Sequence, residues 1–350
     1  MSPIQKIKLN NRLIGHNEPT FIVAEISSNH GQNFEKAKRL VDVSAKAEVD
    51  AIKLQTYTSD TMTIDCDTDY FKVKDKIWKE KTLYNLYKET YMPWKWQPKL
   101  KKYAESKGLI FFSTPFDETA VDFLEELNVQ LYKVASFEIN YIPLLKKIAT
   151  TKKPVIISRG LASEKDIHLA VRTLKNNGCP AVAVLHCVSS YPATPEQMNL
   201  KTITDIGKRF DVIPGLSDHT LTIEIPIASV ALGANIIEKH ITLSRKQGGL
   251  DASFSLEPNE LKTLVKSIRT VEKAFGKVTY DIGEKEKKNI IFRRSIFVVK
   301  DIKKGEKFNK KNIRVIRPEY GLHPKFYEEI IGKKAKRNLK RGTPLKEGDK

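Results

Sequence analysis

Cysteine and long hydrophobic runs are both scarce in this 350-residue chain. Its three cysteines, Cys66, Cys179 and Cys187, form no C-x-x-C pair, and an odd number cannot all pair as disulfides. This usage is typical of a reducing compartment. No segment approaches the roughly 20 apolar residues of a membrane-spanning helix, and the first residues lack the apolar core of a signal peptide. We therefore expect a cytoplasmic globular protein with no membrane partner.

Negative charge is also in short supply. The chain carries 42 Asp and Glu against 61 Lys and Arg, a formal net charge of +19. A surplus of positive charge is typical of proteins that bind nucleic acid. Here, however, the basic residues are spread along the chain and aromatic-rich RNA-binding motifs are missing. We expect no nucleic acid, and favour a lysine-rich surface whose field attracts an anionic small molecule.

Apolar segments typical of buried strands alternate with helical patterns over most of the chain. Eight such segments are present, at residues 21–26, 51–57, 109–116, 131–138, 154–160, 181–190, 212–220 and 235–242. Helical periodicity separates most of them, and an insertion at residues 58–108 interrupts the alternation. This rhythm predicts an α/β protein with a (β/α)₈ TIM barrel. A doubly wound sheet is the alternative, but no G-x-G-x-x-G motif follows the first strand.

Nearly every predicted strand becomes polar towards its C-terminal end, the face at which barrel enzymes place their active sites. Burying so many polar groups is costly unless they pair with one another or with a ligand. The pattern therefore predicts an enzyme site whose lysines and hydroxyls hold a phosphate or carboxylate. The polar set is Glu25, Asn29, His30, Lys53, Gln55, Ser113, Thr114, Lys133, Ser136, Glu138, Ser158, Arg159, His186, Ser189, Tyr191, Ser217, Asp218, His219, Glu238, Lys239 and His240.

Some of these residues have purely structural alternatives. Lys53 and Lys133 could be ion-paired lysines inside a barrel. His186 lies within an apolar strand and is better interpreted as a hydrogen-bonded core histidine than as a ligand. Asn29 and His30 could instead cap the helix that begins near residue 33.

Two histidines end neighbouring predicted strands. Because His219 and His240 lie on the last two strands, both imidazoles can reach one divalent metal. Two histidines with positions open to oxygen ligands suit Mn²⁺, Mg²⁺, Co²⁺ or Zn²⁺. The alternative is two unrelated histidines.

Seven ordered motifs resemble those of the sialic acid synthase family: "AEISSNHG", "DAIKLQTYTSDTMT", "FFSTPFD", "YKVASFE", "LHCVSSYP", "GLSDHT" and "IIEKHIT". Members of that family condense phosphoenolpyruvate with an N-acetylated sugar to give nine-carbon sugar acids. The resemblance covers essentially the whole chain. The segments "TYTSDTMT", "SFEIN" and "RPEYGLHPKFYEEIIGKKA" are most similar to the pseudaminic acid synthases within it.

The resemblance implies a role for each matching residue. Glu25 would act at the reacting centre, and His219 and His240 would hold the metal, typically Mn²⁺. The sugar would face Gln55, Glu138, Tyr191 and Asp251. Phosphoenolpyruvate would be bound by Lys53, Thr114, Lys133, Ser136, Ser158, Ser189 and Ser217. One departure is Arg159, which stands where the family often has threonine.

The rhythm changes near residue 280. Residues 281–292 are polar and charged, as in a linker, so we expect a catalytic barrel over 1–280 and a small β-rich domain over 293–350. A weak repeat relates residues 301–313 to 338–349. This tail resembles the antifreeze-like (SAF) module of the same family, which implies a domain-swapped homodimer with Arg317 contacting the sugar. The alternative is a module for dimerisation or stability alone.

Three other functions compete with this hypothesis. One is another phosphoenolpyruvate–aldose condensing barrel, such as a 3-deoxy sugar acid synthase, although that class lacks the SAF tail. Another is an aldolase forming a Schiff base at Lys133 or Lys53. The third is a basic nucleic-acid binder without activity. Within the family, N-acetylneuraminate and legionaminate synthases remain alternatives.

Overall fold

The computed structural model describes residues 6–73 and 81–350, so residues 74–80 of the predicted insertion lie outside the described residues. The chain divides into two compact units, Met1–Gly276 and Lys277–Lys350. In the described ranges, no helix is both long and apolar enough to cross a membrane.

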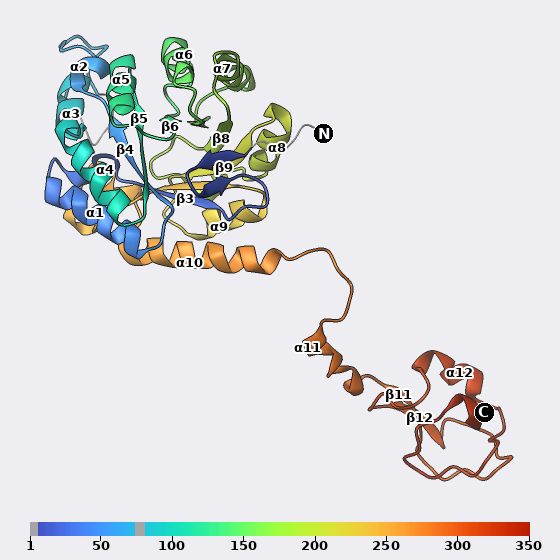
Figure 1. Ribbon diagram of the computed structural model, residues 1–350. Coiled ribbons are helices and arrows are strands. Elements are labelled where there is room, and N and C mark those ends of the chain that lie inside the picture. The colour runs from blue at the N-terminus through green and yellow to red at the C-terminus, as the bar shows by residue number, and fades with distance from the viewer. Residues whose placement is uncertain (1–5, 74–80) are drawn as a thin grey trace. The chain divides into compact units, whose positions relative to one another are not determined.

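Eight parallel strands close into a barrel, which confirms the predicted fold (Figure 1). They follow chain order, and the last pairs with the first. Their residues are almost all buried, as expected for a sheet covered on both faces. The strands are β3 (Phe21–Glu25), β4 (Ala51–Thr56), β5 (Ile110–Pro115), β6 (Tyr132–Val134), β7 (Val155–Ser158), β8 (Val182–Cys187), β9 (Ile213–Asp218) and β10 (Ile236–His240).

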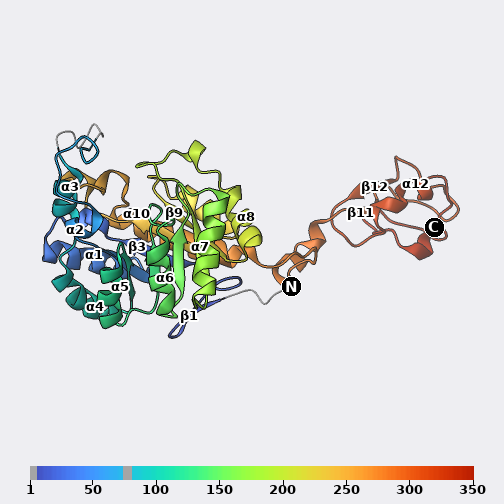
Figure 2. The ribbon, with the colours of Figure 1, turned by 90° about the horizontal axis from the view of Figure 1, so that it is seen from above.

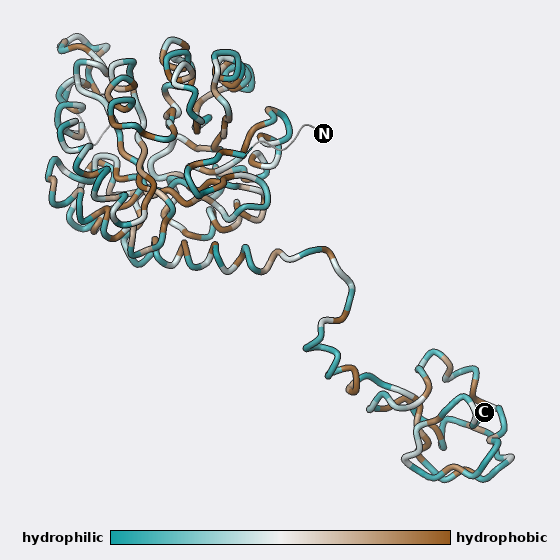
Figure 3. Tube along the Cα trace, in the orientation of Figure 1, coloured by the Kyte–Doolittle hydropathy of each residue, from teal (hydrophilic) through white to brown (hydrophobic). Residues whose placement is uncertain are grey.

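Helices surround the barrel (Figure 2) and bury one side against the strands, so that apolar residues concentrate on the strands and the inner helix faces (Figure 3). They are α1 (Phe34–Lys46), α4 (Gln97–Ser106), α5 (Glu118–Glu126), α6 (Ile142–Thr150), α7 (Glu164–Asn176), α8 (Lys201–Phe210), α9 (Glu224–Ala231) and α10 (Pro258–Phe275). Asn33 caps α1 by accepting a hydrogen bond from Lys36 N at 2.9 Å. The alternative in which Asn29 and His30 cap this helix is therefore wrong.

The insertion between β4 and β5 adds the short helices α2 (Ser59–Met62), α3 (Leu83–Thr90) and η2 (Trp94–Trp96). Contacts to Tyr57, just beyond β4, anchor it. The Tyr57 ring packs edge-on against Tyr87, with centroids 5.9 Å apart, and Trp94 Nε1 donates to Tyr57 O at 3.0 Å. The insertion therefore stands over the C-terminal end of the barrel on the β4 side.

An N-terminal hairpin, β1 (Ile7–Leu9) and β2 (Arg12–Ile14), was not predicted, because strands of three residues are too short to show periodicity. Ile7, Leu9 and Ile14 belong to the same buried cluster as Phe21, at the start of β3. The hairpin thus closes the N-terminal end of the barrel interior, opposite the face where the strands end.

In the second unit, β11 (Ser295–Val298) pairs antiparallel with β12 (Ile313–Ile316), and two short helices are present, α11 (Glu284–Lys287) and α12 (Tyr327–Ile330). The second unit also contains the 3₁₀ turns η6 (Ile290–Phe292), η7 (Pro324–Phe326) and η8 (Glu347–Asp349), and a similar turn in the first unit is η3 (Pro195–Gln197).

The weak repeat in the tail has a structural counterpart. Ile302 and Leu339 occupy matching positions and exchange two backbone hydrogen bonds of 2.8 Å. Gly305 and Gly342, also matching, have φ of +82° and +86°, a conformation that favours glycine. The two halves of the repeat therefore pair with each other around one small core.

The N-terminal hairpin yields a stability prediction with a matched control. Ile14→Ala should lower the free energy of unfolding by about 2–5 kcal/mol, because it leaves a cavity beside fully buried neighbours. Its neighbour Leu13 is 38% exposed, and Leu13→Ala should cost only about 0.5 kcal/mol. Urea denaturation of both variants measures the difference, and equal costs would show that the hairpin does not seal the barrel.

Candidate active site

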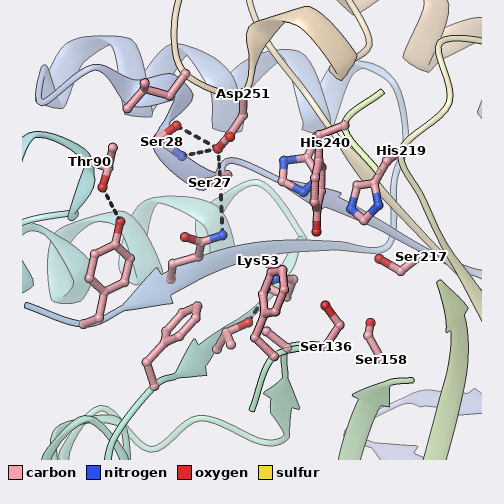
Figure 4. A pocket seen from close by; sticks show the side chains of 18 of the residues that line it. Ser27, Ser28, Lys53, Thr90, Ser136, Ser158, Ser217, His219, His240 and Asp251 are labelled. Carbon is pink, nitrogen blue, oxygen red and sulfur yellow. Dashed lines mark hydrogen bonds between the residues drawn. The ribbon is translucent and has the colours of Figure 1, made fainter. Parts of the chain in front are cut away.

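A cavity of about 620 Å³ opens at the C-terminal ends of the barrel strands (Figure 4). The structure brings together in its lining thirteen of the residues singled out from the sequence: Lys53, Gln55, Thr114, Lys133, Ser136, Glu138, Ser158, Tyr191, Ser217, His219, Glu238, His240 and Asp251. Glu25 and Ser189 do not line the cavity but contact residues that do.

Two buried lysines form the floor of this cavity. Lys53 Nζ donates to Thr114 Oγ1 at 3.0 Å, and Lys133 Nζ donates to Ser158 Oγ at 2.7 Å. Both ammonium groups are almost inaccessible to bulk solvent, so their field is weakly screened. This floor suits a ligand with phosphate and carboxylate groups.

A close approach of backbone completes one side of the floor. Ser136 Oγ and Ser189 Oγ lie 3.2 Å apart. Gly160 lies against both, and a Cβ at this position would come within 2.2 Å of Ser136 Cβ. Only glycine fits at position 160 without moving the two hydroxyl groups, so the site geometry requires glycine there.

Two carboxylates balance the two lysines. Glu238 Oε1 lies 3.8 Å from Lys53 Nζ and 3.7 Å from Lys133 Nζ, and Glu25 forms an ion pair with Lys53. Burial by itself raises the pKa of Glu238, but Lys133 and Lys53 outweigh it and hold that pKa low. Burial also disfavours the charge on Lys53, yet Glu238 and Glu25 keep its pKa raised.

Glu25 lies behind Lys53 rather than in the cavity. One of its oxygens accepts a hydrogen bond from Ser27 N at 2.8 Å, and the side chain is fully buried. Burial raises the pKa of Glu25 to about 7 despite the opposing effect of Lys53. Because Glu25 does not line the cavity, it would act on a bound ligand only through its ion pair with Lys53.

The two predicted metal-binding histidines converge, with ring centroids 5.3 Å apart. Burial lowers the pKa of both, so each imidazole is neutral near pH 7. His219 Nδ1 lies 3.0 Å from Val188 O, which places the proton on that nitrogen and leaves the Nε2 lone pair free. His240 Nδ1 is buried without a hydrogen-bond partner in the described part of the chain.

These histidines fit a divalent metal whose remaining ligands are oxygens of substrate or water. A metal site built from protein ligands alone needs at least three His, Cys, Asp or Glu side chains close together. Residues 6–73 and 81–350 contain no such group. The pair is therefore suited to an open site.

A buried ion pair fixes the two strands that carry the histidines. Asp218 and Lys239 face each other in the register of β9 and β10, and Lys239 Nζ donates to Asp218 Oδ2 at 2.6 Å. Neither side chain is exposed to solvent. Because side chains alternate along a strand, this pair lies on the opposite face from His240 and Glu238. It thereby sets the register in which the imidazoles meet.

A loop after β10, containing η4 (Arg245–Gln247) and η5 (Ala252–Phe254), covers the histidines. The Phe254 ring lies 5.0 Å from His240 and 5.8 Å from His219, measured between centroids, and Tyr191 lies 4.5 Å from His219. These rings shield the imidazoles from solvent on one side.

The same loop is tied to η1 (Ser27–His30), the turn after β3. Asp251 Oδ2 accepts hydrogen bonds from the Ser27 hydroxyl, from Ser28 Oγ at 2.7 Å and from Ser28 N at 3.2 Å (Figure 4). Gln55 Nε2 donates to Ser27 Oγ at 3.0 Å. Asp251 and Gln55, far apart in the chain, therefore occupy one hydrogen-bonded edge of the cavity.

Glu138 is a second carboxylate of the cavity that, like Glu238, has a buried oxygen without a hydrogen-bond partner among the described residues. Its Oε2 atom is buried with no hydrogen-bond partner in the described ranges. Burial raises the pKa of Glu138 to about 7, although Lys133 opposes the shift. A buried acceptor in this state can bind a ligand N–H or O–H group or accept a proton.

His186 is a hydrogen-bonded core histidine, as the sequence indicated. Arg159 Nε donates to His186 Nδ1 at 3.0 Å, and His186 Nε2 contacts Met198 O. Burial lowers the pKa of His186 to about 4, with Arg159 adding to the effect. Arg159, the departure from the family pattern, thus supports a buried histidine and does not line the cavity.

Arg317 belongs to the second unit, where it is exposed and forms no hydrogen bond or ion pair with the described residues. Several lining residues were missed from the sequence. Ser27 and Ser28 stood inside the first motif and could have been found, whereas Met62, Leu86 and Phe254 lie in segments without strand-end patterning. Their place in the cavity depends on how the insertion and the loop after β10 fold.

Comparisons with known proteins find relatives for both parts of the chain. Residues 40–280 match the model of the NeuB family, and residues 293–349 match that of the SAF domain. A pseudaminic acid synthase from Campylobacter jejuni is 41% identical over 94% of this chain and 96% of its own length. One from Helicobacter pylori is 40% identical over 95% and 98%.

A solved structure is also similar. The crystal structure of an N-acetylneuraminic acid synthetase from Leptospira borgpetersenii in complex with citrate has a TM-score of 0.73 and 37% identity, covering 82% of this chain and 95% of that one. The likeness in sequence and fold therefore extends through the barrel that carries the cavity.

The Asp218–Lys239 pair yields the prediction for this site. Lys239→Met should lower the free energy of unfolding by about 3–5 kcal/mol, because it leaves the Asp218 carboxylate buried and unpaired. The double variant Asp218→Asn with Lys239→Met removes both charges and should recover part of that loss. Urea denaturation compares the three proteins. If Lys239→Met alone were as stable as the unmodified chain, the Asp218–Lys239 pair would not stabilise the two strands.

Proposed function

Because the chain belongs to the NeuB family, we propose that it condenses phosphoenolpyruvate with an N-acetylated hexose and water to give a nine-carbon, sialic-acid-like sugar acid and phosphate. The observation that carries this proposal is one cavity that holds two buried lysines and two uncharged imidazoles. The relatives' names favour pseudaminic acid as the product, and hence a di-N-acetylated trideoxy hexose as the sugar. We place the reaction in the cytoplasm, where free thiols such as Cys66 persist.

Phosphoenolpyruvate carries a phosphate and a carboxylate, which the lysine floor suits. We assign its binding to the two ammonium groups and the hydroxyls around them, which are Lys53, Lys133, Thr114, Ser136, Ser158, Ser189 and Ser217. Glu25 is assigned as a positioning residue, because its ion pair with Lys53 fixes that ammonium group. Glu238 acts in the same way between the two lysines.

His219 and His240 would hold a divalent metal, for which we propose Mn²⁺, with Mg²⁺ and Co²⁺ as alternatives. When bound, the metal supplies a Lewis acid that polarises the aldehyde oxygen of the open-chain sugar. The sugar then lies along Gln55, Glu138, Tyr191 and Asp251, and Phe254 excludes water on the side of the imidazoles.

The reaction joins carbon 3 of phosphoenolpyruvate to the aldehyde carbon. The cationic centre left at carbon 2 takes up water, whose proton needs an acceptor, and the carbon–oxygen bond to phosphate then breaks. Glu138 has a buried free oxygen and a pKa raised to about 7, so it can accept this proton. Lys53 and Lys133 stabilise the charge that develops on the departing phosphate.

The second unit is proposed to complete the site of a partner in a domain-swapped homodimer. Arg317 is exposed and without a partner in the described part of the chain. Val278 and Tyr280 are 93% and 98% exposed, an unfavourable state for apolar side chains that a second copy would relieve. An Arg guanidinium suits hydrogen bonding to sugar hydroxyl and amide oxygens.

Phosphate release from phosphoenolpyruvate tests the proposed function. The protein with Mn²⁺ should release phosphate with the aldose precursor of pseudaminic acid faster than with those of legionaminic and N-acetylneuraminic acids, and excess chelator should abolish release. ¹⁸O in the bridging position of phosphoenolpyruvate should leave with the phosphate.

Lys133→Ala should reduce kcat/KM for phosphoenolpyruvate by about a hundredfold, since it removes a buried charge from the lysine floor. Borohydride trapping of pyruvate on the enzyme, with no loss on chelation, would instead support the Schiff-base aldolase. Fastest release with either other sugar would reassign the substrate within the family.

Mixed dimers test the domain swap. Lys133→Ala and Arg317→Ala should each be nearly inactive alone, but a mixture that exchanges subunits should regain about a quarter of the unmodified activity. Half of randomly formed dimers are mixed, and each then has one complete site, with the Lys133 and Arg317 side chains coming from different subunits. Activity no greater than the sum of the separate variants would contradict the swap.

A further inference from the structure

The second unit carries a loop whose guanidinium group is available to a ligand. Residues 317–321 follow β12, which pairs with β11 (Figure 1), and are called the arginine loop here. The Arg317 side chain is exposed and forms no hydrogen bond or ion pair with the described residues. The nearby carboxylate of Glu319 is engaged elsewhere, since its Oε2 atom lies 3.3 Å from Arg293 Nε. The loop therefore presents one free cation to its surroundings.

A single buried hydroxyl group fixes the backbone of this loop. Ser295, the first residue of β11, is inaccessible to solvent. Its Oγ atom donates to Pro318 O at 2.7 Å and accepts a hydrogen bond from Gly321 N at 2.8 Å. Because one atom binds both the second and the last residue of the loop, it sets the distance between them.

Further contacts restrict the same backbone. Tyr320 N donates to Pro318 O at 3.1 Å, and Lys346 Nζ donates to Tyr320 O. Gly321 lies so close to β11 that a Cβ atom there would come within 2.2 Å of Ile296 O. The backbone of the arginine loop is thus held to one path, although the loop lies at the surface.

A fixed backbone helps a flexible side chain to bind. Arginine loses rotamer freedom when it binds a ligand, and a mobile backbone would add to that entropy cost. Removing the Ser295 hydroxyl would leave Pro318 O and Gly321 N without their partner, and the loop could regain hydrogen bonds to water only by moving. The position of the Arg317 guanidinium therefore depends on a hydroxyl group that is itself buried away from any ligand.

We propose that Ser295 is a positioning residue for the condensation, because it fixes the arginine loop so that Arg317 binds the sugar in the cavity of a partner subunit. This inference rests on the proposed function, which takes Arg317 to contact the sugar there. Ser295 acts on sugar binding without touching the sugar. Binding of phosphoenolpyruvate depends on the lysine floor of the barrel and is independent of Ser295.

Ser295→Ala tests this role, because it removes the hydroxyl group and keeps the side chain small. The rate of hydrogen exchange over residues 319–322 should rise at least about tenfold, since Gly321 N–H loses its acceptor. In phosphate-release assays with Mn²⁺, KM for the sugar should rise about tenfold, because the guanidinium is no longer held in place. The KM for phosphoenolpyruvate should stay unchanged.

Val298→Ala is the matched control for a general loss of stability. Val298 is buried in the core of the second unit and pairs with Ile313, at the opposite end of β11 from Ser295. Its truncation should lower the resistance of the second unit to urea. It should leave both the exchange of residues 319–322 and the KM for the sugar as in the unmodified protein.

Mixed dimers show whether Ser295 acts on the same side as Arg317. When Ser295→Ala exchanges subunits with Lys133→Ala, half of the random dimers contain one site with an intact barrel and an intact second unit. This mixture should reach about a quarter of the unmodified activity at low sugar concentration. With Arg317→Ala no such site forms, because both substitutions lie in the second unit, and activity should not exceed the sum of the separate variants.

The results separate this role from the proposed function. Unchanged exchange or an unchanged sugar KM in folded Ser295→Ala would overturn the positioning role alone, as would an equal rise of KM in Val298→Ala. If circular dichroism shows that Ser295→Ala does not fold, Lys346→Met loosens the same loop at Tyr320 O, and an unchanged sugar KM in that variant would also refute the role. Absence of phosphate release by the unmodified protein with every N-acetylated aldose would refute both proposals.

Discussion

Burial of ionised side chains at the mouth of the barrel is the constraint on which the rest of the site depends. Charge moved out of water is costly unless opposite charge and hydrogen bonds surround it. Here Lys53 and Lys133 meet Glu25 and Glu238, and hydroxyl groups fill the remaining hydrogen-bonding positions. The arrangement leaves two buried lysine ammonium groups facing the cavity, where an anionic ligand can pair with them. The site is thus organised before any ligand arrives.

The parallel barrel explains how residues so far apart in the chain reach this arrangement. Each strand ends at the same face, so one or two polar residues per strand suffice to build the floor. Register then decides which side chains point inwards, because neighbours alternate between faces. The buried contact between Asp218 and Lys239 shows this clearly, since the outward residues of β9 and β10 hold the inward His240 and Glu238 in place. Stability and site geometry are coupled through the same two strands.

Much of the fold and part of the site could be predicted from sequence because both follow from local patterns. The eight apolar segments are long and regular, and their polar ends marked Lys53, Thr114 and His240 directly. Other features leave no such pattern. The N-terminal hairpin is too short for periodicity, and Asn33, not Asn29, proved to cap α1. Glu25 belonged to the polar set predicted at the strand ends, yet its ion pair with Lys53 holds it behind the cavity.

Sequence by itself determined that this chain forms a barrel with a polar mouth, because hydrophobic periodicity and strand-end composition are properties of consecutive residues. The tertiary structure decided which of those polar residues meet a ligand and what the rest of the cavity is made of. Met62, Leu86 and Phe254 line the cavity only because the insertion and the loop after β10 fold over the strand ends. Contacts between segments far apart in the chain depend on packing, which no local pattern encodes.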